Sequence, residues 1–378
     1  YDPVALTLGQ KIWSINWGLV LLVLMIAGIG FLTLYSAAGG DSDTWVVRQI
    51  IRFAVGVVVM FIVALIDIRF WFRFAYAGYL GAFGLLGVVE VLGTVEGGAQ
   101  RWVNIGVFNL QPSEIMKLAL VLALARYFHG RTEEQVGQLR GLMVPLLMII
   151  VPVALVLRQP DLGTAILIAI GGIAILFLVG VRIWKFVVAF LAVVGSMPLV
   201  WGYLRDYQKS RVMTFFDPER DPLGAGYHII QSKIALGSGG LVGKGFMLGT
   251  QSHLNFLPEK HTDFIFTVFA EEFGLIGGLV LLALYILTIV ACFVMSLRVR
   301  NQFGRLLGLG VTATFFIYIF INIAMVMGLV PVVGVPLPLI SYGGTAMVTI
   351  LAGFGLLMNV HIHREVRIPR RPGSVVET

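Results

Sequence analysis

The sequence predicts an all-α integral membrane protein with about ten transmembrane helices and one large extracytoplasmic loop between the seventh and the eighth. Three observations carry this prediction. Of the 378 residues, 58% are hydrophobic and only 12% are charged. The mean hydropathy of +0.93 lies outside the usual range of water-soluble domains. The apolar residues also form long runs, and a spanning helix needs about 20 of them.

Ten apolar runs approach the length that crosses a bilayer. They cover residues 13–37, 45–66, 71–93, 112–128, 141–157, 162–180, 184–203, 264–297, 306–331 and 342–362. The fourth, fifth and sixth runs are short. Residues 204–262 form the one long polar stretch, which we expect to be the large loop between the seventh and eighth helices.

The basic residues of the short connections predict the orientation. Alternate connections hold most of them: Lys11, Arg69, Arg73, Arg126, Arg131, Arg140, Arg182, Lys185, Arg298, Arg300, Arg305, Arg364, Arg367, Arg370 and Arg371. The short connections opposite hold Arg101 and Arg158. Because Lys and Arg gather on the cytoplasmic side, both termini are expected there. The seven basic residues of 204–262 do not oppose this, since long loops translocate largely regardless of charge.

Residues 1–363 are expected to form one membrane domain, and residues 364–378 a basic, disordered cytoplasmic tail. The formal charge of +7 does not indicate nucleic-acid binding, because the basic residues sit in short clusters between apolar runs. The single cysteine, Cys292, excludes an internal disulfide. Since the chain begins with Tyr1, we expect the original N-terminus to be missing, and no cleavable signal is recognisable.

An acidic and a basic residue open the fourth apolar run. Glu114 and Lys117 are three residues apart on one helical face, where they could form a structural ion pair. Eight apolar residues follow Lys117, however, and an ionisable group inside a span is costly and indicates function. We therefore favour a polar pocket or a substrate-binding role. On the outer side, Arg101 is a candidate for an anionic headgroup or a substrate phosphate, whereas Trp102 fits an interfacial anchor.

The polar connections supply weaker candidates. Asp161 fits a helix cap as well as it fits a functional role. Within 204–262, Arg211 and Lys244 are candidate cations, and the glycines around Lys244 would let the backbone approach a phosphate. Their spacing does not match a P-loop, and the segment faces away from cytosolic nucleotides.

Polar side chains gather at the mouth of the eighth apolar run. The candidate site residues there are Glu259, Lys260, His261 and Asp263. Thr262 or Asp263 could cap the following helix, but a cap does not need the whole group. A carboxylate at this position could deprotonate a hydroxyl of a substrate whose lipid portion lies in the bilayer. Glu271 and Glu272 follow about two turns further along, and their cost again indicates a polar interior.

Residues 328–345 cannot form a regular helix, because three prolines and four glycines interrupt them. Irregular backbone at membrane depth is tolerated only where protein or water buries it. We therefore expect this segment, which follows Asn322 of the ninth run, to line a cavity.

Three motifs resemble one family: Gln111–Lys117, Leu257–Phe266 with Glu271–Gly274, and Pro338–Thr345. The chain resembles the shape, elongation, division and sporulation (SEDS) family over nearly its whole length, and more its elongation branch than its division branch. The resemblance implies a ten-span protein of the bacterial cytoplasmic (inner) membrane with its active site on the outer face. It further implies a peptidoglycan glycosyltransferase that polymerises lipid II without nucleotide sugars.

The resemblance also implies roles for residues and partners. Asp263 would be the essential residue and general base, Glu114 and Lys117 would line a central cavity, and Ser341 of the third motif joins the candidate substrate-binding residues. A class B penicillin-binding protein, a transpeptidase, would be the partner within the elongation complex.

The reaction implied by the resemblance releases undecaprenyl pyrophosphate. Cations must then neutralise the leaving group, and the candidates are Arg101, Lys117, Arg211, Lys244 and Lys260. No cofactor is required; a divalent cation, Mg²⁺ or Mn²⁺, could share the task, although no ligand cluster demands one. Two rival functions stay open: a lipid II flippase, suggested by buried charges and broken helices, and a non-catalytic scaffold of the wall-synthesis complex.

Overall fold

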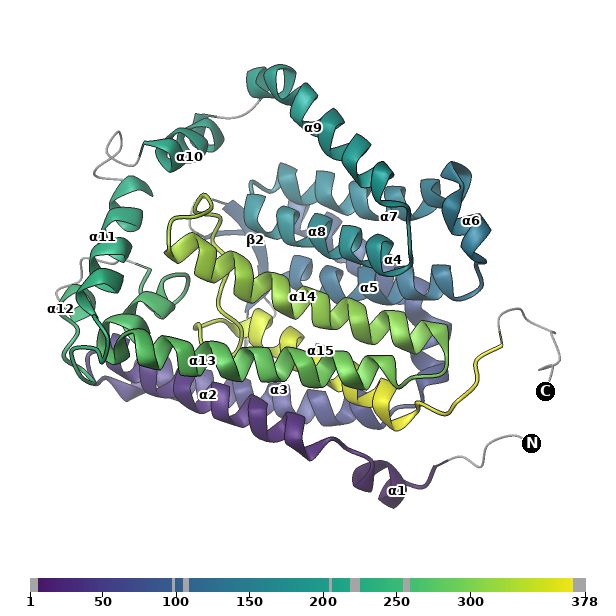
Figure 1. Cartoon of the computed structure of the whole chain (residues 1–378), viewed down its shortest axis with the longest axis horizontal. Helices are drawn as coiled ribbons and strands as arrows, with labels where there is room; N and C mark the ends of the chain where they lie inside the picture. Colours follow the sequence, from purple (N-terminus) through teal and green to yellow (C-terminus); the bar gives the residue numbers. More distant parts are fainter. Residues whose placement is uncertain are drawn as a thin grey trace.

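The computed structural model describes residues 6–96, 99–104, 109–203, 206–217, 225–253 and 259–369. Nearly all regular elements are helices (Figure 1). The helices of the first half are α1 (Leu8–Trp13), α2 (Trp17–Ala37), a π-helix (Ser42–Val46), α3 (Val47–Leu65), α4 (Ile68–Leu92), α5 (Pro112–His129), α6 (Glu133–Gly137) and α7 (Leu139–Arg158). Those of the second half are α8 (Leu162–Leu178), α9 (Ile183–Tyr203), α10 (Asp206–Phe216), α11 (Ala225–Ser238), α12 (Thr250–His253), α13 (Ile265–Leu297), α14 (Gln302–Val326) and α15 (Gly344–Ile362).

A helix occupies each of the ten predicted apolar ranges, so the all-α membrane fold is confirmed. Within the described residues, seven helices are long and apolar enough to cross a membrane: α2, α3 with its π-helical start, α4, α7, α13, α14 and α15. Helix α8 and the apolar part of α9 (Ile183–Pro198) are apolar but shorter than the 18 residues that a candidate span needs. The count of ten spans therefore stays a prediction.

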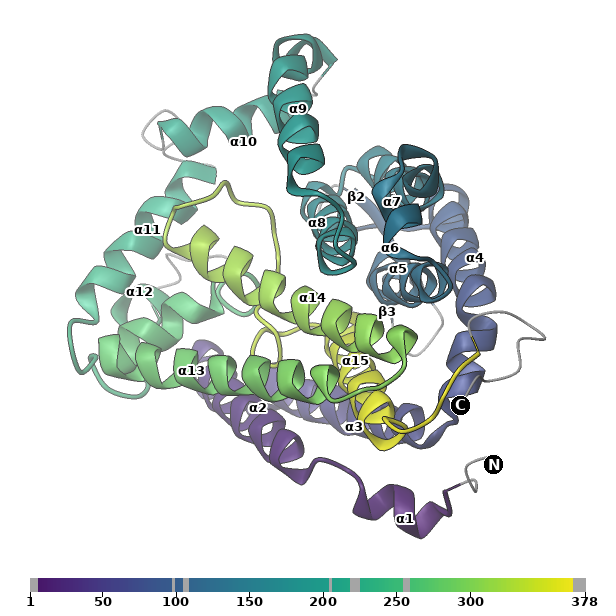
Figure 2. The same ribbon diagram turned by 45° about the vertical axis from the view of Figure 1, so that its right-hand side comes forward.

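Helices α14 and α15 form the centre of the bundle. In each of them 72% of the most apolar window is buried, against at most 44% in the other five candidate spans. The long helices lie roughly side by side in Figure 1, and α9 stands away from them in Figure 2. Its apolar side chains, such as Phe190 and Met197, are exposed, as expected for a helix that faces lipid.

Small residues let α3 and α15 pack closely. A Cβ atom added to Gly355 of α15 would lie 2.6 Å from the carbonyl oxygen of Met60, and one added to Gly56 of α3 would meet Leu351. Close backbone approach through small residues is the usual way in which helices associate within a bilayer. This packing holds α15, whose first residues, Gly344 and Thr345, end the third motif.

Helix α13 is broken at Gly274, whose φ of 64° and ψ of −161° are not helical. The glycine-rich segment 240–245 enters the break and completes the backbone hydrogen bonds that the helix loses. The four bonds, each 3.0 Å long, are Lys244 N to Glu271 O, Gly245 N to Glu272 O, Leu275 N to Gly240 O and Ile276 N to Leu241 O. The glycines around Lys244 therefore serve the fold of α13.

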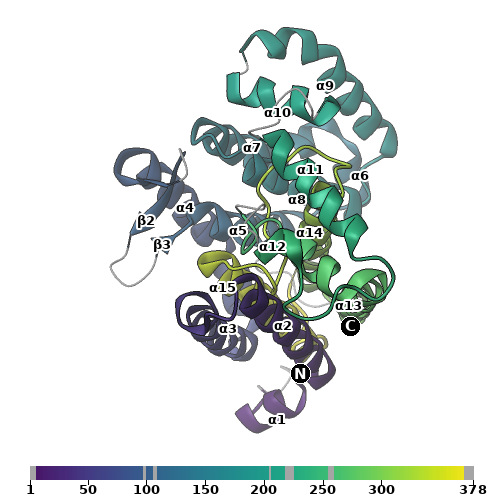
Figure 3. The ribbon, with the colours of Figure 1, turned by 90° about the vertical axis from the view of Figure 1, so that its left-hand side faces the viewer.

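The polar connections at this end of the bundle are more regular than the sequence suggested. Helices α10, α11 and α12 form within residues 204–262 and lie at the left of Figure 1. In the short outer connection 94–111, three strands form the antiparallel sheet β1-β2-β3 (Thr94–Glu96, Ala99–Asn104 and Asn109–Leu110). Figure 3 shows β2 and β3 beside α4.

Residues 364–369 pack on the opposite end of the bundle. The carbonyl of Arg364 accepts a hydrogen bond from Arg300 N (3.1 Å). The carbonyl of Val366 accepts one from Asn301 Nδ2, and that of Ile368 lies 3.1 Å from His129 Nε2. The remainder of the predicted tail, residues 370–378, lies outside the described residues.

We predict that Gly243→Ala destabilises the protein strongly. The φ of Gly243 is +80°, and an added Cβ atom would lie 2.0 Å from Glu272 O. A strained φ alone costs about 1–3 kcal/mol, and the clash adds to it. Gly237→Ala is the matched control, because a Cβ atom at Gly237 of α11 meets nothing within 4 Å. The apparent thermal midpoint in detergent should fall for Gly243→Ala alone; equal midpoints would contradict the assignment of the glycine segment.

Candidate active site

The short segment before α13 holds Asp263 at the mouth of the bundle. Asp263 is partly exposed, and its position just before the helix lets the positive end of the α13 dipole favour a negative charge there. Three successive carbonyl groups of this segment accept hydrogen bonds. The pairs are His261 O with Tyr342 N (2.8 Å), Thr262 O with Ser341 Oγ (2.6 Å) and Asp263 O with Asn322 Nδ2 (2.9 Å). Backbone held this way restricts where the Asp263 carboxylate can lie.

The irregular segment 327–343, which makes two of these bonds, is itself held by the surrounding helices. Tyr285 of α13 donates its hydroxyl to Pro338 O (2.6 Å), and Gln49 of α3 donates its amide to Ser341 O (2.8 Å). Glycines allow the segment to pass close to two other helices: a Cβ atom at Gly163 would lie 2.1 Å from Val333 O, and one at Gly30 2.7 Å from Leu339 O. Protein thus buries most of residues 335–341, as the bilayer requires, whereas Met327 and Leu329 are exposed.

Gly334 borders the Asp263 carboxylate directly. A Cβ atom at position 334 would lie 3.3 Å from Asp263 Oδ2, and the φ of Gly334 is +72°. Glycine adopts this conformation without the penalty that a side chain would bring. The backbone of 327–343 therefore contacts both the main chain and the side chain of the Asp263 segment.

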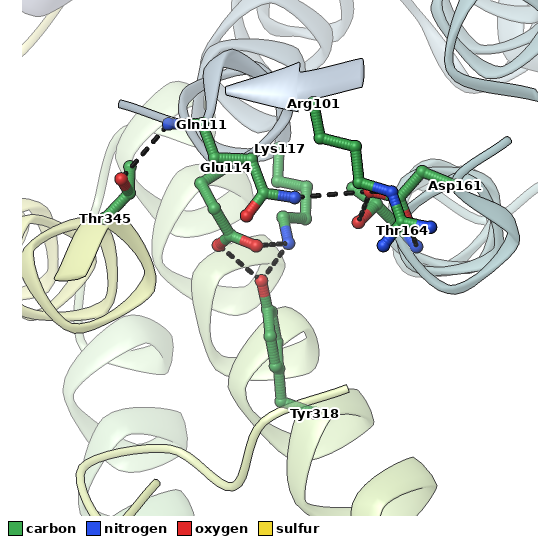
Figure 4. A network of polar contacts seen from close by, with 8 residues as sticks. All are labelled: Arg101, Gln111, Glu114, Lys117, Asp161, Thr164, Tyr318 and Thr345. Atoms are coloured by element: carbon green, nitrogen blue, oxygen red, sulfur yellow. Dashed lines mark hydrogen bonds and ion pairs between the residues drawn. The ribbon is translucent and has the colours of Figure 1, made fainter. Parts of the chain in front are cut away.

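Glu114, Lys117 and Tyr318 form a buried polar cluster between α5 and α14 (Figure 4). Lys117 Nζ lies 2.6 Å from Glu114 Oε1, and the Tyr318 hydroxyl donates to Glu114 Oε2 at 2.7 Å. Lys117 also donates to the Tyr318 hydroxyl. All three residues are at most 4% exposed. Charges buried to this extent are tolerated because they are paired and hydrogen-bonded.

A small cavity of about 30 Å³ adjoins this cluster between α5, α14 and α15. Its walls are mostly apolar, and the polar residues among them include Glu114, Lys117 and Tyr318. Glu114 and Lys117 thus both line a cavity, and their role in substrate binding stays a prediction. The lining residues of this cavity do not include residues 328–343.

A second polar cluster joins β2, α5 and α8 (Figure 4). Asp161 caps α8 by accepting hydrogen bonds from the main chain and the hydroxyl of Thr164 (3.2 and 2.8 Å). It also accepts a bond from Gln111 Nε2 (3.2 Å) and lies 3.8 Å from Arg101 Nε. Arg101 donates to Pro160 O as well (2.9 Å). Asp161 is therefore a cap that also holds Arg101 near the beginning of α5.

Residues 341–345 contact both parts of the site. Ser341 and Tyr342 bind the Asp263 segment, as described above, and Thr345 binds the chain that enters α5. The Thr345 hydroxyl accepts a bond from Gln111 N (3.1 Å) and donates to Asn109 O (3.0 Å). One short segment thus connects Asp263 with the clusters of Glu114 and Asp161.

The model of the cell cycle protein family of FtsW, RodA and SpoVE matches residues 16–366, nearly the whole chain. This chain belongs to that family. The FtsW/RodA/SpoVE relative from Escherichia coli, the peptidoglycan glycosyltransferase MrdB, is 47% identical over 350 residues, which cover 92% of this chain and 93% of the relative.

Solved structures of the FtsW/RodA/SpoVE fold agree with these matches. A chain from a peptidoglycan synthase complex that coordinates polymerization and crosslinking is 36% identical, with a TM-score of 0.81 over 93% of this chain and 98% of that one. The crystal structure of the rod shape determining protein RodA from Thermus thermophilus is 30% identical. Its TM-score is 0.72, over 93% of this chain and 98% of that one.

Three further residues were predicted to bind the substrate: Lys244, Ser341 and Arg211. Lys244 is bound by the buried carboxylate of Glu271 at 2.7 Å, which makes it part of the packing around the α13 break. Ser341 is 4% exposed, and its hydroxyl both accepts from Leu337 N and donates to Thr262 O. We therefore revise its role from substrate binding to support of the Asp263 segment. The side chain of Arg211 lies outside the described residues.

The three residues before Thr262 differ in exposure. Glu259 is exposed and accepts a hydrogen bond from the Thr262 hydroxyl (2.9 Å). Lys260 is 9% exposed, and burial lowers its pKa. His261 stacks on Trp45, with ring centroids 4.4 Å apart. Burial, with the nearby charge of Lys260, lowers the pKa of His261 from its usual 6.5.

Sequence reasoning missed several residues of the site. Gln49 and Arg52 interrupt the second apolar run, and isolated polar residues of this kind could have been singled out. Arg52 lies over the ring of Tyr342, 4.5 Å from its centre. Nothing in the sequence distinguishes Tyr318 and Trp45 as site residues, because aromatic residues are common in membrane helices and at their ends.

Within the described residues, no group of three or more His, Cys, Asp or Glu side chains could hold a metal ion. A divalent cation stays a prediction from the reaction, and the steps considered below do not use one.

We predict that His261 makes stability fall with acidity. A histidine of the unfolded chain binds a proton near pH 6.5, whereas folded His261 binds it only at lower pH. Between these two values the unfolded state holds more protons, so the free energy of unfolding decreases as the pH falls. His261→Phe keeps an aromatic partner for Trp45 and cannot be protonated. The variant should therefore lose less of its thermal midpoint between pH 7.5 and 5.5; the same loss as wild type would contradict the prediction.

Proposed function

We propose that this protein is a peptidoglycan glycosyltransferase that polymerises lipid II into β-1,4 glycan strands during cell elongation. Its family membership and the activity named for the Escherichia coli relative support the reaction class. One observation carries the proposal for the site. Asp263 lies at the mouth of the bundle, and hydrogen bonds to three successive carbonyls, those of residues 261–263, hold its main chain in place. We call these three bonds the clamp. A general base needs such fixed geometry.

In the proposed step, the acceptor lipid II presents its sugar 4-hydroxyl to Asp263. The carboxylate takes the proton while the hydroxyl oxygen forms a bond to the anomeric carbon of the donor lipid II. The bond from that carbon to the pyrophosphate oxygen breaks, and undecaprenyl pyrophosphate leaves with the electron pair. Attack opposite the leaving group inverts the α-linked donor into a β-1,4 glycan. Neither a redox group nor a nucleotide is consumed.

The negative charge that develops on the pyrophosphate needs cations. Lys117 and Arg101 belong to the two clusters connected through residues 341–345, and Lys260 lies three residues before Asp263. We propose these three as the phosphate-binding cations, with Glu114 holding Lys117 in place. Lys244 is left out of this set because its ion pair with Glu271 lies at the break of α13.

We propose that the protein lies in the bacterial cytoplasmic membrane with Asp263 on the outer face. The basic residues support this orientation, since they concentrate in the connections at the other end of the bundle. Both termini would then lie in the cytoplasm, and residues 204–262 would form the large extracytoplasmic segment of a single membrane domain, residues 1–363. Residues 364–378 would be its cytoplasmic end.

A class B penicillin-binding protein is the proposed partner. The support is the 36% identical chain from the peptidoglycan synthase complex, in which polymerization and crosslinking are coordinated. A transpeptidase beside Asp263 would crosslink the strands as they form. The other proteins of the elongation complex are further proposed partners.

A lipid II flippase is the second candidate, because the irregular segment 327–343 and the break at Gly274 resemble the broken helices of transporters. The two functions differ in their product: a flippase moves lipid II unchanged, whereas a glycosyltransferase consumes it.

We predict that Asp263→Asn and Asp263→Ala abolish the polymerisation of purified lipid II, because neither side chain can accept the proton from the 4-hydroxyl. The assay uses the protein co-purified with its transpeptidase partner, whose own active site is blocked. General-base assistance contributes about 10²–10⁴-fold, so the rate should fall at least that far.

Asp43→Asn is the matched control, since Asp43 is an exposed carboxylate on the same proposed side of the membrane. It should keep the wild-type rate. Equal product from wild type and both Asp263 variants would contradict the role of Asp263. No product from any of them, with the complex intact, would favour the flippase.

A further inference from the structure

Asn322 holds the main chain of the Asp263 segment from a regular helix. It lies in α14, the central helix, and is fully buried, with 0% of its surface exposed. Two further groups that bind main-chain carbonyls of this segment belong to the irregular residues 341 and 342. A side chain on a packed helix defines a position more closely than one on a loop. Asn322 therefore provides the fixed point of the clamp.

The amide of Asn322 makes two contacts with main-chain carbonyls near the carboxylate. Its Nδ2 atom donates to the carbonyl of Asp263 itself at 2.9 Å and to the carbonyl of Val335 at 2.7 Å. Val335 directly follows Gly334, whose backbone borders Asp263 Oδ2. The two hydrogens of one NH₂ group thus tie the main chain of Asp263 to the wall against which its side chain lies.

The chemistry of the two partners requires a donor at this position. Both are carbonyl oxygens, which can only accept hydrogen bonds. The Oδ1 atom of Asn322 has no hydrogen-bond partner among the residues that the structure describes, so the NH₂ group makes the contacts that matter here. An aspartate at this site would lose both donors and bring negative charge towards two carbonyl oxygens and Asp263.

We propose that Asn322 is the positioning residue of the Asp263 carboxylate: it sets the distance between Asp263 and residues 334–335 and so aims the carboxylate at the acceptor hydroxyl. This inference rests on the proposed role of Asp263 as general base. Asn322 itself touches neither the substrate nor the reacting atoms. A displacement of about 1 Å at a catalytic group can cost about 10²-fold in rate, so loss of the clamp should lower kcat while leaving KM nearly unchanged.

Asn359 offers a matched control on the next helix. It is also fully buried, and its Nδ2 atom also donates to main-chain carbonyls, those of Val63 (3.2 Å), Ala64 (3.0 Å) and Ile66. These contacts lie at the opposite end of α15 from the residues around Asp263. Asn359→Ala therefore leaves buried carbonyls without a donor, as Asn322→Ala does, but far from the proposed site.

The experiment compares wild type, Asn322→Ala, Asn322→Gln and Asn359→Ala, each as the complex with the partner transpeptidase. The measurements are kcat and KM for purified lipid II, the pH dependence of kcat, and the thermal midpoint. We expect Asn322→Ala to lose about 10²-fold in kcat, with KM changed less than about threefold, and the acidic limb of its pH profile to shift. Asn359→Ala should lower the thermal midpoint, with little change in kcat and in the pH profile.

Asn322→Gln keeps an NH₂ group and should retain more of kcat than Asn322→Ala, with an acidic limb closer to that of wild type. If Asn322→Ala does not accumulate, Asn322→Gln decides the question: its amide is displaced by one methylene, so its kcat should fall below that of wild type and of Asn359→Ala. A wild-type kcat and pH profile in the Asn322 variants, or losses matched by Asn359→Ala, would overturn the positioning role.

Asp263→Asn in the same series separates this inference from the proposed function. An active Asp263→Asn would refute the base role itself. An inactive Asp263→Asn beside a fully active Asn322→Ala would refute the positioning role alone.

Discussion

A chain that leaves helical structure inside a membrane must find hydrogen-bond partners for its main chain within the protein, because the bilayer core supplies none. Residues 327–343 meet this constraint through side chains of three helices: Gln49 of α3, Tyr285 of α13 and Asn322 of α14. The same segment then binds the main chain of residues 261–263. The position of Asp263 thus depends on how the surrounding helices satisfy an irregular stretch of backbone.

The main chain at the break in α13, which follows Asp263 in the sequence, also finds its hydrogen-bond partners within the protein. The lost helical bonds at Gly274 are replaced by the segment 240–245, and Lys244 pairs with the buried carboxylate of Glu271. The first turns of α13 are therefore joined to the segment that precedes them, while residues 341–345 connect Asp263 to Glu114, Lys117 and Tyr318 through the entry to α5. Two interruptions of helices assemble one site from distant parts of the chain.

The sequence predicted the helices well, because long apolar runs have few alternatives in a bilayer. It also indicated Glu114 and Lys117, since ionisable residues are costly at membrane depth, and it indicated Asp263 through the polar group at the mouth of the eighth apolar run. It could not assign Lys244 or Ser341, whose partners Glu271 and Thr262 are distant in the chain or on another element. The sheet β1-β2-β3 and the contacts of Tyr318 were missed for a similar reason: tertiary contacts, which no local pattern encodes, decide them.

The central claim is that the clamped carboxylate of Asp263 receives the acceptor proton. A structure of the Asp263→Asn complex with lipid II bound tests it most directly, because that variant should hold the substrates without turnover. The account predicts that the acceptor 4-hydroxyl lies about 2.6–3.2 Å from the side chain of residue 263, within hydrogen-bond reach. The contacts from Asn322, Ser341 and Tyr342 should stay in place. An acceptor hydroxyl that instead contacts another carboxylate, well away from residue 263, would contradict the account.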